Sequence, residues 1–302
     1  MNNITILGPT ATGKTALAAE VAYRLKGEVI SADSRQVFRG MDIGTGKDLA
    51  DYHVHGTDIR HHLIDICDPR EEYSAYRFLN DFKQAYEDIM SRGLQPILCG
   101  GTGLYIDAVV RQYQLADAPI DPEYRASLEQ YSDEELTERL ASLAPLHNHT
   151  DTETRARLVR ALEIQEFARD HPEAYTRLPE MQHRIFGIQL ERQEVIDRIE
   201  RRLRARMEEG MTDEVQQLLD NGIPAERLIR FGLEYRHITN YILGRCTKEE
   251  MFRDLFTDIR RFAKRQMTWF RRMERCGVAI RWIDGKLSLD EKAAIVCKEG
   301  II

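Results

Sequence analysis

The sequence predicts an α/β fold, in which a parallel sheet carries a phosphate-binding loop, helices flank the sheet and a helical insertion interrupts it. Three short apolar segments, residues 3–7, 28–31 and 96–99, are typical of buried strands. Helical segments separate these strands, and strands that alternate with helices form parallel sheets. From about residue 113, charged helical stretches replace the β-branched runs, which predicts the insertion.

The amino-terminal half contains the predicted strands and two helices between them. Residues 3–7 form the first strand, a glycine-bearing turn follows, and residues 16–22 form a helix. The second and third strands lie at residues 28–31 and 96–99. Between them, apolar residues recur at the three- and four-residue steps of an amphipathic helix, namely Ala75, Phe78, Leu79, Phe82, Tyr86 and Ile89.

The carboxyl-terminal half is mostly helical. We expect a helical insertion domain at residues 113–183 and a discontinuous core made of residues 1–112 and 184–302. Residues 185–188 return to the sheet as a strand. The remaining predicted elements are two long basic helices, near residues 192–209 and 249–275, and a short strand at residues 279–283.

The composition is that of a globular protein and excludes a disordered chain. With 302 residues, the chain has room for two domains, and 42% hydrophobic with 31% charged residues is ordinary for a globular protein. The 43 Lys and Arg against 50 Asp and Glu leave a formal net charge of −7. Nucleic-acid-binding domains are commonly basic, so this sum argues mildly against a nucleic-acid partner.

Cysteine usage and hydropathy indicate a cytoplasmic protein. The five cysteines are scattered and form no C-x-x-C pair, which fits a reducing compartment. We find neither a signal peptide nor a run of about 18 apolar residues, so no membrane association is expected. Four histidines, at positions 53, 55, 61 and 62, have spacings that could hold a transition metal, although structural histidines in a loop are favoured.

Residues 8–15 match the phosphate-loop motif G-x-x-x-x-G-K-[ST] between a predicted strand and a predicted helix. Backbone N–H groups, the helix N-terminus and the lysine would bind a diphosphate or polyphosphate, and the Thr15 hydroxyl would hold Mg²⁺. A glycine-rich turn without function is the disfavoured alternative, and a nucleoside triphosphate is the default ligand. The diphosphate-binding candidates are Gly8, Pro9, Thr10, Ala11, Thr12, Gly13, Lys14 and Thr15.

Asp33 follows the second strand at the sheet edge where ligands of open α/β sheets bind. Its carboxylate could take a proton from a nucleophile that attacks a phosphate-bearing substrate. The alternative is a capping role in the turn after the strand.

An ordered series of strings resembles the bacterial tRNA dimethylallyltransferase family, also called tRNA isopentenyltransferases. Any one string could arise by chance, but the series covers most of the chain in order. The strings are GPTATGKT at 8–15, SADSRQVFRGMDIGTGK at 31–47, HHLIDICDP at 61–69, PILCGGTGLYI at 96–106, RALE at 160–163 and AKRQMTWFR at 263–271.

The resemblance implies an enzyme in which the phosphate loop holds dimethylallyl diphosphate. The exocyclic N6 amine of the adenosine 3′-adjacent to the tRNA anticodon attacks the allylic carbon, and diphosphate leaves with help from Mg²⁺ on Thr15. Asp33 matches the family's general base, and Thr102 matches a threonine at the reaction centre. Without the family context, the glycines around Thr102 could simply form a flexible turn after the third strand.

Arg202 is the third catalytic candidate. On a helical projection it lies about 60° from Ile199, the centre of an apolar stripe, and Arg206 lies about 20° away, so both point toward the protein body. A buried arginine needs an anionic partner. In the family's R-I-x-x-R pattern the last arginine, here Arg202, contacts the diphosphate; a structural salt bridge is the alternative.

Basic charge gathers on the last long helix. Residues 260–275 carry seven Lys and Arg against Glu274 alone, with aromatic residues interleaved. The resemblance favours tRNA contact there over a purely structural helix. It also implies an extruded adenine, whose edge Gln36 could read. The tRNA-facing candidates are Asp33, Ser34, Arg35, Gln36, Thr102, Arg125, Ala156, Arg157, Leu158, Val159, Arg160, Arg230, Phe231, Gly232, Leu233, Glu234 and Tyr235.

Positions 38, 46, 48 and 12 depart from the family's pattern. Phe38 replaces a commoner tyrosine, which removes a hydroxyl near the substrate, while Gly46 and Asp48 alter a small-Lys-Pro string around Lys47. These changes affect the expected tRNA contact, whereas Thr12 in place of serine leaves the phosphate chemistry unchanged.

The expected partners are the tRNA anticodon stem-loop and dimethylallyl diphosphate, with the insertion domain contacting tRNA and a single chain acting alone. The main alternative function is a phosphate-loop small-molecule kinase, but we identify neither an arginine-bearing lid nor a pocket for a nucleotide base. A nucleotide-gated RNA-binding protein without catalysis is the third possibility.

Overall fold

The computed structural model describes residues 3–143 and 152–300. The chain divides into two compact units, which we call the core unit (Met1–Arg111 with Pro179–Ile302) and the insertion unit (Gln112–Leu178). The chain re-enters the core unit before position 183, where we had expected the insertion to end. The reason is that Gln182 already accepts a 2.7 Å hydrogen bond from Asn3 in the first strand.

A six-stranded sheet forms the centre of the core unit, and all its pairings are parallel. Every strand expected from the sequence is present. The two-residue strand β5 was not expected, because it is too short to show a periodic pattern. In spatial order the strands are β5 (His61–His62), β2 (Gly27–Ala32), β6 (Gln95–Gly100), β1 (Asn3–Leu7), β7 (His183–Gln189) and β8 (Arg281–Asp284).

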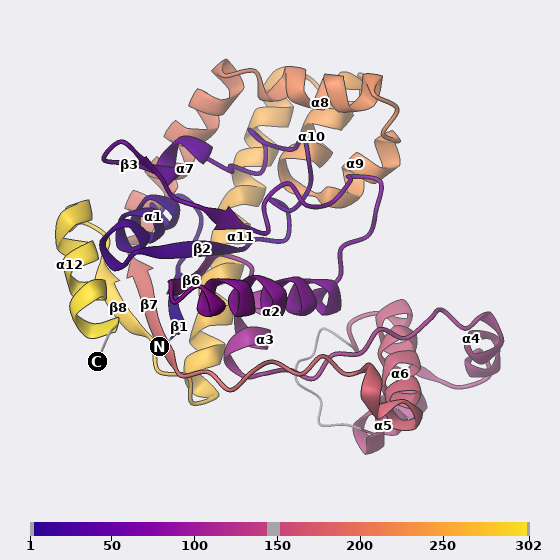
Figure 1. The fold of residues 1–302 in the computed structure, drawn as a ribbon. Helices are drawn as coiled ribbons and strands as arrows, with labels where there is room; N and C mark the ends of the chain where they lie inside the picture. Colours follow the sequence, from indigo (N-terminus) through magenta and orange to yellow (C-terminus); the bar gives the residue numbers. More distant parts are fainter. Residues whose placement is uncertain (1–2, 144–151, 301–302) are drawn as a thin grey trace. The chain divides into compact units, whose positions relative to one another are not determined.

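Helices cover both faces of the sheet (Figure 1). Helices α1 (Lys14–Leu25) and α12 (Leu289–Gly300) lie on one face, and α2 (Ala75–Ser91) and α3 (Gly103–Val110) lie on the other. Because both faces are covered, the central strands are buried on both sides. Every residue of β1 is buried, including the polar Asn3 and Thr5.

A further group of helices packs together beside the sheet (Figure 1). The basic helices expected near 192–209 and 249–275 are confirmed as α7 and α11. The sequence pattern does not reveal the helices between them, α8 to α10, because each is only seven to ten residues long. The group comprises α7 (Arg192–Glu208), α8 (Met211–Asp220), α9 (Ala225–Phe231), α10 (Leu233–Ile242) and α11 (Lys248–Arg275).

The insertion unit has its own small core. Five leucines from its three helices are almost fully buried, namely Leu128, Leu136, Leu140, Leu158 and Leu162. The helices are α4 (Pro122–Leu128), α5 (Asp133–Leu143) and α6 (Arg155–Asp170), followed by a 3₁₀ turn at Pro172–Ala174. The charged helical stretches that replace the β-branched runs from about residue 113 therefore belong to a separately packed helical unit.

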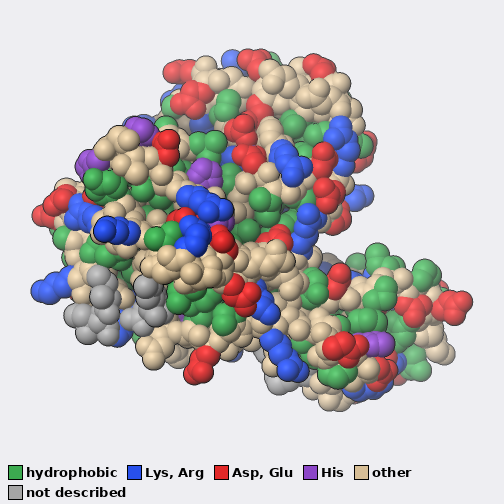
Figure 2. Space-filling model, in the orientation of Figure 1, with side chains coloured by type: hydrophobic (Ala, Val, Ile, Leu, Met, Phe, Trp, Pro, Cys, Tyr) green, Lys and Arg blue, Asp and Glu red, His purple; other side chains and the backbone are tan. Residues whose placement is uncertain are grey.

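Acidic and basic side chains are interspersed on the face drawn in Figure 2.

A small antiparallel pair of strands, β3 (His53–Val54) and β4 (Thr57–Asp58), follows the 3₁₀ turn Leu49–Tyr52. In the ranges that the structure describes, no helix combines the length and apolarity needed to cross a membrane.

Candidate active site

The sheet topology gathers three loops at one edge. Strands β1, β2 and β6 are neighbours and parallel, so the segments that follow their carboxyl ends meet at the same edge. These segments are the phosphate loop (residues 8–15), the turn that begins at Asp33, and the Gly101–Thr102 turn. The register places Gly100 beside both Leu7 and Ala32, which brings the three loops level with one another.

The phosphate loop is shaped by backbone conformations that glycine tolerates. Gly13 caps the start of α1 with φ 81°, and Ala11 adopts φ 65°. Both Thr12 Oγ1 and Lys14 Nζ donate hydrogen bonds of 2.8 Å to the Pro9 carbonyl. The loop is thus held from inside, with the lysine folded back over it.

Two cations border the phosphate loop. Lys14 begins α1, and Arg202 on α7 donates a hydrogen bond from Nη2 to Thr10 Oγ1. Burial, reinforced by the proximity of Arg202, lowers the pKa of Lys14 to about 8. Burial and the nearby Arg206 lower the pKa of Arg202 to about 10. Burial is the main cause of both shifts, and a bound anion would favour the charged forms of both side chains.

Arg206, one turn further along α7, is the arginine that forms a structural salt bridge. The residue is 6% exposed, and its guanidinium nitrogen Nη2 lies 3.0 Å from Asp48 Oδ1. A Cβ at Gly46 would overlap this guanidinium, so the glycine makes room for it. In the described part of the chain no carboxylate forms an ion pair with Arg202. The predicted inward orientation of both arginines is confirmed, but only Arg206 has an anionic partner.

Asp33 caps the turn that follows β2. Its Oδ1 accepts hydrogen bonds from the backbone N–H groups of Arg35 at 2.8 Å and Gln36 at 3.4 Å. The capping alternative considered from the sequence therefore describes one of the two carboxylate oxygens. Among the described residues no hydrogen bond engages Oδ2, so that oxygen could accept a proton.

Thr102 connects the third loop to the Asp33 turn. Its Oγ1 accepts a 3.0 Å hydrogen bond from the Ser34 backbone N–H, and its own N–H donates to the Ala32 carbonyl at 3.1 Å. Thr102 also occupies the N-cap position of α3. The structure therefore brings Asp33 and Thr102, two of the three catalytic candidates, into adjoining turns, while their roles stay predictions.

Internal hydrogen bonds hold the Gln36 amide in place. Its Nε2 donates to the Gly46 carbonyl at 2.9 Å, and its Oε1 accepts from Ser31 Oγ at 3.0 Å. Each polar atom of the amide keeps one further hydrogen-bonding position, so the expectation that Gln36 reads a base edge stays a prediction. Gln36 also ties β2 to the loop around Gly46.

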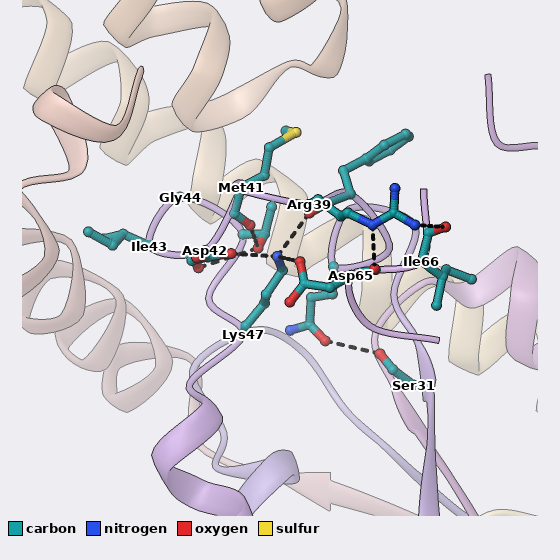
Figure 3. A network of polar contacts seen from close by, with 12 residues as sticks. Ser31, Arg39, Met41, Asp42, Ile43, Gly44, Lys47, Asp65 and Ile66 are labelled. Atoms are coloured by element: carbon teal, nitrogen blue, oxygen red, sulfur yellow. Dashed lines mark hydrogen bonds and ion pairs between the residues drawn. The ribbon is translucent and has the colours of Figure 1, made fainter. Parts of the chain in front are cut away.

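A buried cation organises the loop after Gln36 (Figure 3). Lys47 is 1% exposed, and its Nζ donates to the Phe38 carbonyl at 2.8 Å, to Asp42 Oδ1 at 2.5 Å and to Asp65 Oδ1. On the other side of the loop, one carboxylate on α8 accepts hydrogen bonds from three successive backbone N–H groups and from a tyrosine hydroxyl. These contacts join Glu214 to Asp42, Ile43, Gly44 and Tyr235.

We predict that Lys47→Met lowers the free energy of unfolding by about 1–3 kcal/mol, because it leaves the carbonyl and both carboxylates without their buried donor. Urea unfolding followed by circular dichroism measures this change. Lys298→Met on α12 makes the same chemical change at an exposed position and should leave the midpoint in place. Equal midpoints for both variants would contradict the organising role of Lys47.

Three of the tRNA-facing candidates are interior residues. Leu158 is 1% exposed, Phe231 is 5% exposed and Tyr235 is 2% exposed. They pack in apolar clusters of the protein, and their assignment to tRNA contact stays a prediction. Phe38, also 2% exposed, packs edge-on against Phe231 with ring centroids 4.8 Å apart. A tyrosine hydroxyl at position 38 would therefore not stand at an open surface.

The remaining candidates are divided between the units. In the core unit Arg230 is exposed, Arg35 lies over the Phe231 ring at 5.3 Å, and burial raises the pKa of Glu234. Ser34, Gly232 and Leu233 are partly buried. In the insertion unit Ala156 and Arg157 are exposed and Val159 is partly buried, while Arg125 and Arg160 both pair with the buried Glu163.

Helix α11 faces the site with a polar residue that the sequence reasoning missed. Its buried residues recur at helical spacing, and Gln266 is the one polar member among Met251, Leu255, Ile259, Ala263, Gln266, Phe270 and Met273. A glutamine in an otherwise apolar stripe was the signal that could have revealed it. The exposed face of the same helix carries the predicted basic residues.

A cavity of about 880 Å³ opens beside the phosphate loop. Pro9 lies at its wall, and the other walls come from α7, α11 and the segments around β7 and β8. Its apolar lining includes Val195, Ile199 and Met267, and its basic lining includes Arg260 and Arg271. The cavity therefore offers both apolar surface and positive charge, which suits an anion with a hydrocarbon chain.

Two histidines of the histidine-rich segment contact carboxylates. His53 lies 2.6 Å from Asp58, and His62 lies 2.7 Å from Glu28. Glu28, His62 and Asp88 are close enough to share a metal ion, but Arg92 already pairs with both carboxylates. A guanidinium in that position occupies the oxygens that a cation would need.

Comparisons with known proteins agree with this geometry. The IPP transferase family model matches residues 36–273, and the isopentenyl transferase model matches residues 1–65. The chain is 54% identical to tRNA dimethylallyltransferase 2 of Porphyromonas gingivalis over 98% of both chains.

Solved structures give the same result. The full-length tRNA isopentenylpyrophosphate transferase of Bacillus halodurans is 35% identical, with a TM-score of 0.72 over 99% of this chain and 95% of that one. A eukaryotic dimethylallyltransferase acting on tRNA, 23% identical, shares the fold, with a TM-score of 0.76 over 99% of this chain and 77% of that one. The predicted resemblance is thereby confirmed, and the chain belongs to the tRNA dimethylallyltransferase family, the IPP transferases.

Proposed function

We propose that the protein transfers the dimethylallyl group from dimethylallyl diphosphate to the exocyclic N6 amine of the adenosine 3′-adjacent to the tRNA anticodon, with release of diphosphate. One observation carries the proposal: Lys14 and Arg202 border the phosphate loop beside the Asp33 turn, and neither has a carboxylate partner in the described ion pairs. Such a site is suited to a diphosphate leaving group next to a proton acceptor.

The chemistry follows from these positions. The amine nitrogen forms a bond to the allylic carbon, the bond from that carbon to the diphosphate oxygen breaks, and a proton passes from the amine to Asp33. Lys14, Arg202 and the loop N–H groups stabilise the charge that develops on the leaving diphosphate. The apolar walls of the cavity beside Pro9 offer space for the five-carbon chain.

Thr15 fits the predicted Mg²⁺ site. Its hydroxyl is a hard oxygen donor in the first turn of α1, and no hydrogen bond to it occurs among the described residues. A magnesium ion held there would neutralise charge on the diphosphate. We propose Mg²⁺ as the cofactor on this basis.

Radiolabelled dimethylallyl diphosphate and unmodified tRNA test the function directly. We expect label to appear in tRNA, and nuclease digestion should locate it at the adenosine next to the anticodon. The absence of label transfer, together with ATP hydrolysis, would instead support the small-molecule kinase.

Diphosphate binding should depend on pH through Lys14. The pKa of this residue is lowered to about 8, so the free protein loses the proton as pH rises through 8. Because the diphosphate binds the charged form, affinity for inorganic pyrophosphate should be constant below pH 8 and fall toward tenfold per pH unit above it. Calorimetric titration measures this, and the ratio to Lys14→Met at each pH removes the ligand's own ionisation. A constant ratio up to pH 10 would contradict the role of Lys14.

tRNA binding should weaken steeply with salt. Most basic residues at 260–275 are exposed on α11, where phosphate contacts would release counterions. About four contacts predict a loss of about 100-fold in affinity between 50 and 200 mM salt. Filter binding of tRNA measures the slope, which Arg265→Ala should reduce by about 1. Arg253→Ala, at an exposed arginine paired with Asp254, is the control; an unchanged slope in both variants would exclude this surface.

A further inference from the structure

Gln266 makes two hydrogen bonds to two different loops of the site. Its Oε1 accepts from the Thr10 backbone N–H in the phosphate loop at 2.8 Å, and its Nε2 donates to the Gly101 carbonyl at 2.9 Å. The side chain is 6% exposed, so water does not compete for these contacts. One buried amide therefore bridges the loop after β1 and the turn after β6.

The steric fit around this bridge is equally close. A Cβ at Gly101 would overlap the Gln266 Nε2, and a Cβ at Gly103 would overlap the Trp269 ring. Both contacts come from α11, three residues apart on one face. The absence of side chains at these two glycines lets α11 lie directly on the turn that carries Thr102.

The bridge lies in the middle of a continuous chain of contacts. At one end Arg202 donates to the Thr10 hydroxyl, and the Thr10 N–H donates to Gln266. At the other end Gly101 precedes Thr102, whose Oγ1 accepts from the N–H of Ser34, the neighbour of Asp33. The contacts thus run from the diphosphate side of the site to the side of the proposed base.

We propose that Gln266 is a positioning residue that sets the distance between the phosphate loop and the Thr102 turn; this inference rests on the proposed function. Transfer requires the amine, the allylic carbon and the departing oxygen to be aligned, and a misplacement of about 1 Å costs about 100-fold in rate. An amide fits because it accepts at one oxygen and donates at one nitrogen. A carboxylate of the same length would retain the acceptor for Thr10 but face the Gly101 carbonyl with another oxygen.

Three variants separate positioning from general stability. Gln266→Met keeps the side-chain length and removes both hydrogen bonds, so we expect kcat for label transfer to fall about 100-fold with the KM for tRNA nearly unchanged. Gln266→Glu should lie between Met and the wild type. Gln217→Met makes the first change at an exposed position of α8 and should behave as wild type. A purely structural role would lower the melting temperature and the active fraction but leave kcat per folded molecule unchanged.

A suppressor experiment tests the contact itself. Gly101→Ala should lower kcat because its methyl group displaces the Gln266 amide, and Gly101→Ala with Gln266→Ala should be no worse than Gln266→Ala alone. Multiplied losses in the double variant, or a kcat for Gln266→Met within twofold of wild type, would overturn the proposal.

A second readout does not depend on transfer. We expect Gln266→Met to weaken the binding of inorganic pyrophosphate by about tenfold, because a loop that is no longer held must be ordered on binding. Unchanged binding would contradict the bridge even if the wild-type protein transferred no label. The absence of transfer by the wild type, by contrast, would reject the proposed function alone.

Discussion

Replacing Asp33 by asparagine is expected to lower kcat for prenyl transfer by about 10²–10⁴-fold, the usual contribution of a general base. The asparagine carbonyl can still accept from the N–H groups of Arg35 and Gln36, so the turn keeps its cap. It cannot take the proton from the attacking amine. Single-turnover transfer of labelled dimethylallyl groups measures the loss, and filter binding should show tRNA affinity within about twofold of wild type.

Asp33→Ala is the matched comparison, because it removes both the proton acceptor and the cap. We expect the same loss of kcat together with a lower melting temperature, since capping residues typically contribute about 1 kcal/mol. Residual activity above a tenth of wild type in Asp33→Asn would place the base elsewhere. A large drop in tRNA affinity with normal chemistry would mean that Asp33 serves recognition.

Arg202→Ala should lower kcat/KM for dimethylallyl diphosphate by about 10²–10³-fold, the effect of losing one preorganised group that stabilises transition-state charge. Arg202 donates to the Thr10 hydroxyl at the rim of the phosphate loop and has no carboxylate partner among the described ion pairs. Its charge is therefore available to the diphosphate. Steady-state kinetics should show the loss in both KM and kcat, because the leaving group is bound in the ground state and gains charge in the transition state.

Arg201→Ala provides the control for this prediction, since Arg201 is the exposed neighbour on the same helix. We expect its kinetics to match wild type within about twofold. Arg202→Lys should recover part of the activity, because an ammonium keeps the charge but lacks the two-pronged donor geometry. Equal kinetics for Arg202→Ala and Arg201→Ala would show that the diphosphate is held without Arg202.

Much of the core could be predicted because its signals are local. Each buried strand is a short apolar run, and the phosphate loop has a motif whose spacing is set by the backbone turn that it forms. Position after a strand sufficed to select Asp33, because parallel strands present their carboxyl ends at one edge, whereas Thr102 was selected by the family resemblance. The long helices α7 and α11 were equally accessible through their periodicity.

The surroundings of several tRNA-facing candidates could not be predicted. Phe231 and Tyr235 fill the apolar cluster around α8 to α10, three helices that the sequence does not reveal. The Gln36 amide is hydrogen-bonded to Ser31 and to Gly46. In each case the side chain contacts groups from other segments, and the local sequence does not indicate which groups these are.

The net charge of the chain and the local charge of one helix lead to opposite expectations. The sum of −7 argued against a nucleic-acid partner, whereas residues 260–275 concentrate seven positive charges on one helix. Binding responds to the local potential within about a Debye length and is insensitive to the sum over the chain. The distribution along α11 was readable from the sequence, but its exposure on one face required the fold.

Arg202 and Arg206 show what the sequence determines and what the tertiary structure determines. Helical periodicity alone established that both arginines face the protein body, because residues three and four apart share a face of a helix. Only the tertiary structure decided that Arg206 pairs with Asp48, 158 residues away, and that Arg202 is left beside Thr10. Backbone geometry orients a side chain locally, but the charge that meets it depends on how distant loops pack.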